Sequence, residues 1–243
     1  MSARKITVSG ISKGFGSLSV VDNVTLDVRD GEFIAIVGPS GCGKTTLLNI
    51  IAGFERPDSG SIKIDGVELK SPSRNGIMIS QHGSVFPWMT VQENLLFALS
   101  GTSHPDPAQR AHRYITMVGL EGFEAAYPHQ LSGGMLKRVE LARALVVKPE
   151  ILYMDEPFSA LDALMSLRMQ TELRRILDEE RHTVILITHD VEEAIFLADR
   201  IMVLSPRPTT IQTAFEVDMP HPRKLSDPKA QQLREAILNE LGL

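Results

Sequence analysis

The sequence predicts an α/β protein organised around a parallel sheet, and three observations point to this class. Ile151–Asp155, Thr183–Thr188 and Ile201–Leu204 are short, almost wholly apolar runs, as expected of parallel strands that are covered on both faces. A helical pattern from Ala163 to Arg181 separates the first two runs, so strand and helix alternate. A glycine-rich segment, 38–45, joins a fourth apolar run to a helix, which is the usual place of a phosphate-binding loop.

The first third of the chain is β-rich. Apolar and polar residues alternate over Ile6–Val8 and Val24–Val28, which predicts strands with one buried face. The segment 62–69 predicts a hairpin that turns at Asp65-Gly66, because this dipeptide tolerates the positive φ angles of a two-residue turn. A short strand at 76–80 is expected next.

The middle of the chain, from about 85 to 148, changes to a helical pattern. After Ser205 the sequence is rich in proline and contains one alternating strand candidate, 211–217. The last segment predicts a helix, with Asp227 as its cap and Pro228 in its first turn.

Composition limits the kinds of partner. The 243 residues carry a formal net charge of −5 and no basic stripe, which argues against nucleic acid. A single cysteine excludes an internal disulfide and fits a reducing compartment. No apolar run approaches the roughly 18–20 residues that cross a bilayer, and no signal-peptide pattern follows Met1. We therefore expect a soluble, cytosolic chain that meets a membrane only through a partner.

The segment Gly38–Thr45 fits the phosphate-loop pattern of Gly, four residues, then Gly-Lys-Ser/Thr. Its glycines let successive backbone N–H groups point at phosphate oxygens, and the next helix aims its positive end at the same charge. Lys44 is placed to reach the β- and γ-phosphates, and the Thr45 hydroxyl to bind Mg²⁺. A chance glycine-rich turn is the alternative, and the strand–loop–helix context disfavours it. The candidate nucleotide-binding residues of the loop are Gly38, Ser40, Gly41, Cys42, Gly43, Lys44, Thr45 and Thr46.

Two adjacent carboxylates end the strand at 151–155. Asp155 lies at the carboxyl edge of the sheet beside the phosphate loop, where it can hold Mg²⁺ through water. Glu156 points elsewhere and can polarise an attacking water. An N-capping or surface acidic pair is the alternative interpretation.

Three further segments carry polar groups at element ends. Ser132 is a candidate N-cap of the next helix, and Gly133 and Gly134 leave bare backbone amides at its positive end. Beside the other motifs, these amides favour a second anion site over a cap alone. His189 follows a strand and can donate to a γ-phosphate, although a lone histidine there is usually structural. Gln81 ends the strand at 76–80 and can reach a metal or the attacking water.

Taken in order, these segments resemble the nucleotide-binding subunit of an ATP-binding cassette (ABC) transporter. The matching motifs are the phosphate loop 38–46, the Q-loop residue Gln81, the signature Leu131–Met135, the Walker B residues Asp155 and Glu156, the D-loop Ser159–Asp162 and the switch histidine His189. The resemblance implies a P-loop NTPase (RecA-like) core with an antiparallel β subdomain and an inserted α-helical subdomain. It implies one ABC nucleotide-binding domain over 1–243, with the core at 1–85 and 150–205, the helical subdomain at 86–149 and a C-terminal extension at 206–243.

The resemblance also implies partners. Two subunits, identical or paralogous, would pair head to tail, so that Ser132, Gly133 and Gly134 of one meet the ATP held by Lys44 of the other. Asp162 would lie at this junction, and Gln81, Glu156 and His189 would serve catalysis. Transmembrane permease subunits would take up the motion at the cytoplasmic face of the inner membrane, and an extracytoplasmic solute-binding protein would act indirectly.

Four positions need separate comment. Met135 replaces the usual glutamine of the signature, which keeps the backbone donors but removes a side-chain contact to ribose. Phe15 stands where the family commonly has tyrosine and is expected to stack on adenine, with core packing as the alternative. Trp88 is expected to line the permease groove, unless it is a core residue. Cys42 is expected to be a small filler in the loop; alkylation of its thiol, with protection by ATP, would inhibit.

Several segments are similar to the nitrate, sulfonate and taurine (bicarbonate) branch of bacterial importers, notably Gly43–Phe54, Pro87–Val91 and Asp155–Asp162. This similarity implies an importer of a small oxyanion or sulfonate-type solute. The alternatives are an importer of a different organic solute, a soluble ABC ATPase without a transporter, and a cassette that binds ATP without turnover. The presence of both Glu156 and His189 argues against the last.

Overall fold

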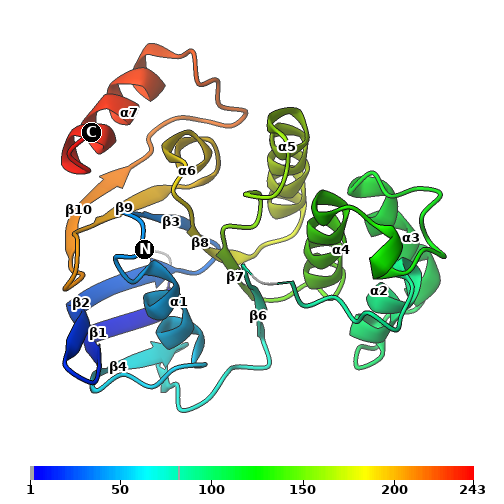
Figure 1. The fold of residues 1–243 in the computed structure, drawn as a ribbon, viewed down its shortest axis with the longest axis horizontal. Coiled ribbons are helices and arrows are strands. Elements are labelled where there is room, and N and C mark those ends of the chain that lie inside the picture. Colours follow the sequence, from blue (N-terminus) through cyan, green and yellow to red (C-terminus); the bar gives the residue numbers. More distant parts are fainter. Residues whose placement is uncertain (1–2, 82) are drawn as a thin grey trace.

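The computed structural model describes residues 3–81 and 83–243 and contains two β-sheets (Figure 1). The larger sheet has the strand order β10-β9-β3-β8-β7-β6, and all neighbouring strands in it are parallel except β10 and β9. Its strands are β3 (Phe33–Val37), β6 (Gly76–Ile79), β7 (Ile151–Asp155), β8 (Thr183–Ile187), β9 (Arg200–Leu204) and β10 (Ile211–Glu216). The predicted α/β class with a parallel sheet is confirmed.

The central strands are buried on both faces, as their apolar composition predicts. Every residue of β3, β7 and β8 is buried. Successive residues of β3 belong to different clusters: Phe33, Ala35 and Val37 pack with the helices on one face, while Ile34 and Ile36 pack on the other. The parallel sheet therefore separates two hydrophobic cores.

The smaller sheet is antiparallel and has the order β2-β1-β4-β5. Its strands are β1 (Arg4–Phe15), β2 (Leu18–Arg29), β4 (Ser59–Ile64) and β5 (Val67–Glu68). The predicted hairpin turn is confirmed, because Asp65 and Gly66 both have positive φ, 51° and 79°. Helix α1 (Lys44–Ala52) shares one buried cluster with this sheet and with the parallel sheet, so it is fixed between them.

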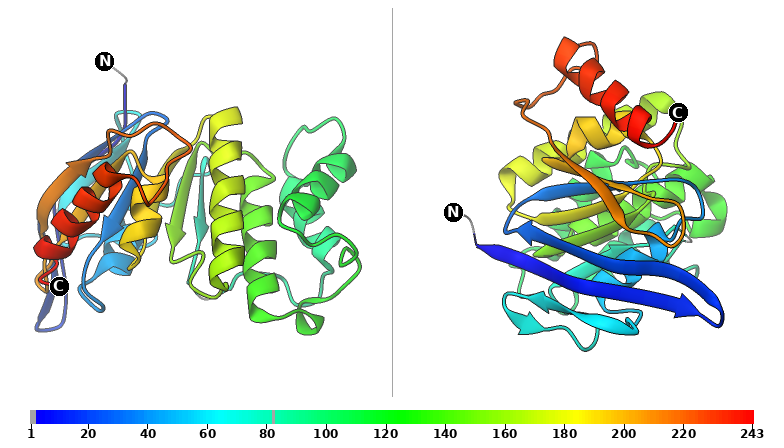
Figure 2. Two further views of the ribbon diagram at one scale, coloured as in Figure 1. Left: turned by 90° about the horizontal axis from the view of Figure 1, so that it is seen from above. Right: turned by 90° about the vertical axis from the view of Figure 1, so that its left-hand side faces the viewer.

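Three helices stand together at one end of the molecule, beyond β6 and β7 (Figure 2). They are α2 (Val91–Leu99), α3 (Pro107–Met117) and α4 (Gly133–Leu145), with the 3₁₀ turn η1 (Pro128–Gln130) before α4. The helical pattern expected over 85–148 is thus confirmed. Among the described residues, no helix has the length and apolar character needed to span a membrane.

The remaining helices complete the core and the tail. They are α5 (Ala163–Glu179), α6 (Val191–Leu197) and α7 (Pro228–Glu240), and α7 packs on α6. The predicted cap of the last helix is confirmed, since the Asp227 carboxylate accepts from the Lys229 N–H at 2.9 Å and Pro228 stands in the first turn. Buried Arg223 donates to the carbonyls of Ile195 and Ala198, which ties the tail to the end of α6.

Candidate functional site

The phosphate loop connects β3 to α1, and its geometry requires glycine. Gly41 and Gly43 have φ angles of 71° and 124°, which side chains of L-residues rarely adopt. A Cβ at Gly43 would also lie 2.7 Å from Cγ1 of Val20. Lys44 is buried, and its Nζ donates to the carbonyls of Gly38 and Pro39, each at 2.9 Å. Its ammonium group therefore lies across the interior of the loop.

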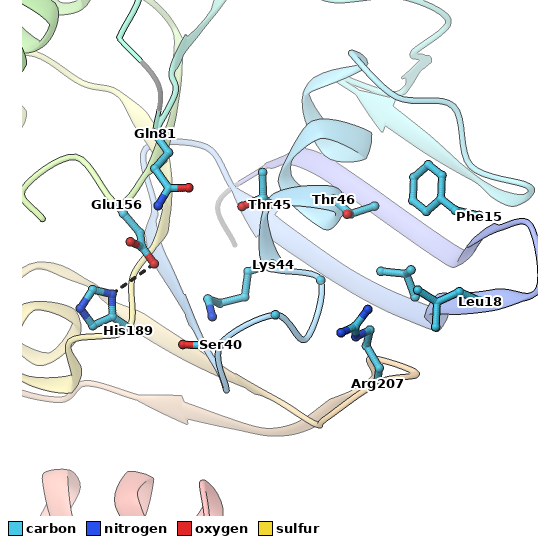
Figure 3. Close-up of a pocket in the computed structure, with 13 residues that line it drawn as sticks. Phe15, Leu18, Ser40, Lys44, Thr45, Thr46, Gln81, Glu156, His189 and Arg207 are labelled. Carbon is cyan, nitrogen blue, oxygen red and sulfur yellow. Dashed lines mark ion pairs between the residues drawn. The ribbon is translucent and has the colours of Figure 1, made fainter.

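A cavity of about 650 Å³ opens over this loop, a size suited to a nucleotide (Figure 3). Ten of its lining residues are among those predicted from the sequence: Phe15, Ser40, Gly41, Gly43, Lys44, Thr45, Thr46, Gln81, Glu156 and His189. Figure 3 shows Gln81, Glu156 and His189 on one side of Lys44, and Phe15 on the other. The cavity thus has a polar end at Gln81, Glu156 and His189 and an aromatic end at Phe15.

Asp155 is a buried carboxylate at the end of β7. Burial raises its pKa, and the charge of Glu156 adds to that rise. The hydrogen bond from the Thr45 hydroxyl and the charges of Lys44 and Lys137 oppose it without cancelling it. The Asp155 carboxylate, the Thr45 hydroxyl and the amide oxygen of Gln81 are hard oxygen donors of the kind Mg²⁺ prefers. A buried carboxylate already paired to a hydroxyl at the phosphate loop fits this ion.

Glu156 turns away from Asp155 because its backbone is in the left-handed region, with φ of 48°. Its N–H donates to the carbonyl of Ile187 on the neighbouring strand at 2.9 Å. Its Oε1 lies 3.1 Å from Nδ1 of His189. The His189 side chain is more than half exposed to solvent and lines the cavity. Unfavourable φ in a non-glycine residue is typical of functional sites, where the surrounding structure imposes it.

The signature residues do not line this cavity. Ser132 caps α4, since its Oγ accepts from the Met135 N–H at 3.3 Å, and this confirms its predicted capping role. A Cβ at Gly134 would lie 3.3 Å from Leu161, so the signature turn sits against the chain's own D-loop. Asp162 is itself the cap of α5, where it accepts from the Met165 N–H at 3.0 Å. Gly133 begins α4 beside these residues, away from Lys44.

Phe15 and Trp88 are not core residues. The Phe15 ring is half exposed at the cavity wall, and Nζ of Lys13 lies 5.2 Å from its centroid. Trp88 is 69% exposed beside Phe86, at 5.5 Å between ring centroids. The core-packing alternatives for both residues are therefore wrong. Cys42, by contrast, is buried in the loop, as expected of a small filler.

Three cavity residues were not predicted: Leu18, Val20 and Arg207. Leu18 pairs with Phe15 across the β1–β2 turn and Val20 follows two residues later, so strand alternation places all three on one face. That pattern is present in the sequence. Arg207 lies in the turn between β9 and β10, and no pattern in its neighbourhood signals that it reaches the loop. Its Nη2 would be 3.7 Å from a Cβ at Gly41.

Comparisons with known proteins agree with this geometry. The family described as ABC transporter matches residues 21–159. An uncharacterized ABC transporter ATP-binding protein of Methanocaldococcus jannaschii, MJ0412, is 43% identical over 98% of this chain and 91% of its own length. The aliphatic sulfonates import ATP-binding protein SsuB of Bacillus licheniformis is 42% identical over 97% of this chain and 92% of its own length.

The fold is also similar to solved structures. The ATP-binding cassette MJ0796, described as a dimer in a post-hydrolysis state with ADP and Pi, superposes with a TM-score of 0.78 at 28% identity, over 88% of this chain and 99% of that one. A second dimeric structure of MJ0796 gives a TM-score of 0.79 at 29% identity.

Proposed function

This chain belongs to the ABC transporter family and is an ATPase of that family, and we propose that it is the ATP-hydrolysing subunit of an importer for sulfonate-type or other small oxyanion solutes. The main support for ATP hydrolysis is the contact between Glu156 and His189. Both residues line one end of the cavity that Lys44 also lines. The relatives named as aliphatic sulfonate importers support the solute class.

In the proposed reaction ATP occupies the 650 Å³ cavity, with adenine against Phe15 and the phosphates at the loop. Lys44 and the loop N–H groups hold the phosphates, and the Glu156 carboxylate takes a proton from the attacking water. The water oxygen bonds to the γ-phosphorus, the bond to the β–γ bridging oxygen breaks, and ADP and phosphate result. His189 donates to the γ-phosphate and orients it. Mg²⁺, held by Thr45, Asp155 and Gln81, would neutralise phosphate charge.

A head-to-tail pair is part of the proposal. Ser132, Gly133, Gly134 and Asp162 lie outside the chain's own cavity, and the bare N-terminus of α4 suits a phosphate brought by a second subunit. The dimeric state of MJ0796 supports this arrangement. The second subunit is an identical chain or a paralogue.

We further propose that permease subunits dock at the exposed aromatic residues Trp88 and Phe97, which lie beside Phe86 just after the Q-loop. The chain would then sit at the cytoplasmic face of the inner membrane and serve an extracytoplasmic solute-binding protein through the permease. The soluble ABC ATPase remains the competing function, and it predicts that no membrane subunit co-purifies with the chain.

Glu156→Gln tests the catalytic assignment. It should reduce ATP turnover by roughly 100-fold or more while ATP binding is retained, because the amide cannot accept the proton. Lys44→Ala is the contrasting variant and should weaken nucleotide binding itself. Full turnover in Glu156→Gln would overturn the assignment.

Growth tests the importer assignment. A strain lacking this chain should fail to grow on an alkanesulfonate as its sole sulfur source, and wild-type protein but not Glu156→Gln should restore growth. Sulfate is the control and should support growth in every strain. Normal growth of the deletion strain on the sulfonates tested would contradict the solute class.

A further inference from the structure

Glu193 on α6 is a buried carboxyl beside the catalytic end of the site. Its residue is 6% exposed, and Oε2 accepts a short hydrogen bond from the hydroxyl of Thr188. Its Oε1 is also buried and has no hydrogen-bond partner among the residues that the structure describes. A second cavity of about 270 Å³ is lined by Glu193 together with Glu156, His189, Ser166 and Gln170. The buried carboxyl therefore lines the same cavity as Glu156 and His189.

Hydrogen bonds connect Glu193 to the two residues that flank His189 in the sequence, Thr188 and Asp190. The Asp190 N–H donates to the Thr188 hydroxyl at 3.0 Å, and that hydroxyl donates to Glu193. The Glu193 N–H in turn donates to Oδ1 of Asp190 at 3.2 Å. Thr188, just before His189, is thus bonded to the Glu193 side chain, and Asp190, just after it, is bonded to the Thr188 hydroxyl and the Glu193 N–H. The imidazole itself projects toward Glu156.

We propose that Glu193 is a positioning residue: through Thr188 it fixes the backbone on both sides of His189 and so sets the imidazole against Glu156. The inference rests on the proposed catalytic roles of His189 and Glu156. It adds a residue that would contact neither ATP nor the attacking water. A backbone shift of the order of 1 Å at His189 would break its 3.1 Å contact, and displacements of this size cost up to about 100-fold in rate.

The protonation of Glu193 agrees with this role. Its pKa is raised to about 8, mainly by burial and also by the charges of Asp190 and Glu156, while the Thr188 hydrogen bond opposes the rise. The titratable groups that line the cavity with Glu193 are Asp190, Glu156 and His189, while the polar side chains of Ser159, Ser166 and Gln170 are uncharged. A neutral carboxyl holds Thr188 without competing with Glu156 for the imidazole.

Three variants test the proposal in steady-state ATP hydrolysis by the full chain. Glu193→Ala should lower kcat on the order of 10-fold with the KM for ATP changed less than about 2-fold, because the phosphate loop is untouched. Glu193→Gln should keep at least half of wild-type kcat, since its amide oxygen accepts from Thr188. Thr188→Val keeps the shape and removes the hydroxyl, so it should reproduce the loss of Glu193→Ala. Glu192→Ala changes a half-exposed neighbour that pairs with Arg234; it is the matched control and should behave as wild type.

The pH profile gives a second readout. Wild-type kcat should fall as pH rises through about 8, where Glu193 ionises, and Glu193→Gln should lack that decline. Wild-type kcat in both Glu193→Ala and Thr188→Val would overturn the proposal, as would the same high-pH decline in Glu193→Gln. If Glu193→Ala does not fold, the kcat of Thr188→Val alone tests the proposal. Loss of turnover in Glu156→Gln, measured in parallel, shows that the catalytic assignment stands whichever way Glu193 behaves.

Discussion

Nδ1 of His189 lies 3.1 Å from Oε1 of Glu156, although 33 residues separate the two in the sequence. The contact exists because Asp155 on β7 pairs with Ile187 on β8, so the residues that follow both strands emerge at the same sheet edge. The left-handed backbone of Glu156 then turns its carboxylate toward the histidine. Two neighbouring parallel strands thus bring a carboxylate and an imidazole to one end of the cavity over the phosphate loop.

His189→Ala should lower ATP turnover by roughly 100-fold while leaving the affinity for ADP unchanged. The reason is that His189 lines only the end of the cavity occupied by Glu156, and the loop residues that hold the first two phosphates are separate. Turnover and ADP binding by calorimetry measure the two effects. An equal loss in both would place His189 in general nucleotide binding.

Gly43→Ala should abolish nucleotide binding and lower thermal stability. The new Cβ would lie 2.7 Å from Val20 and the residue would keep a φ of 124°, so both the packing and the backbone are strained. Gly101→Ala is the control, because nothing lies within 4 Å of its Cβ position and its φ is ordinary. Adding Val20→Ala to Gly43→Ala should restore only part of the stability, since the backbone strain remains.

Arg207→Ala should weaken ATP binding several-fold, and more at low salt than at high salt. Within the described residues the guanidinium has no ion-pair partner, and it lines the cavity beside the phosphate loop. The change removes a positive charge that faces the triphosphate. Arg207→Lys should retain most of the affinity; an unchanged dissociation constant for Arg207→Ala at low salt would show that the side chain stays in solvent.

Glu193→Gln should stabilise the protein relative to wild type increasingly as pH rises from about 5 to 8, and the difference should level off above pH 8. The folded state keeps the Glu193 proton up to about pH 8, whereas the unfolded chain releases it near 4.5. Over this interval the folded state binds more protons, so the contribution of Glu193 to stability is complete below pH 4.5 and is lost as pH approaches 8. The difference in melting temperature between the two proteins measures this, and a difference independent of pH would mean that Glu193 is ionised throughout.

The sequence-based predictions succeed where local physics decides the outcome. The apolar runs form buried parallel strands, Asp65-Gly66 forms the expected turn, and Ser132 and Asp227 cap their helices. Each of these depends on residues that are close in sequence. The phosphate loop belongs to the same group, because its strand, glycines and helix are contiguous.

Local sequence patterns do not predict contacts between segments that are distant in the sequence. Arg207 reaches Gly41 only because β10 turns back along β9. The left-handed backbone of Glu156 has no local signal either, since glutamate does not favour that conformation.

The turn between β9 and β10 also has a role in holding the phosphate loop in place. Thr209 is completely buried there; its hydroxyl donates to the carbonyl of Cys42, and its N–H donates to the carbonyl of Val20 at 2.8 Å. A chain that ended at Leu204 would keep every residue of the phosphate-binding motif but would lose these two hydrogen bonds of Thr209. The conformation of the phosphate loop therefore depends on a residue 167 positions further along the chain, and a substitution in the β9–β10 turn should alter the nucleotide site without touching the motif.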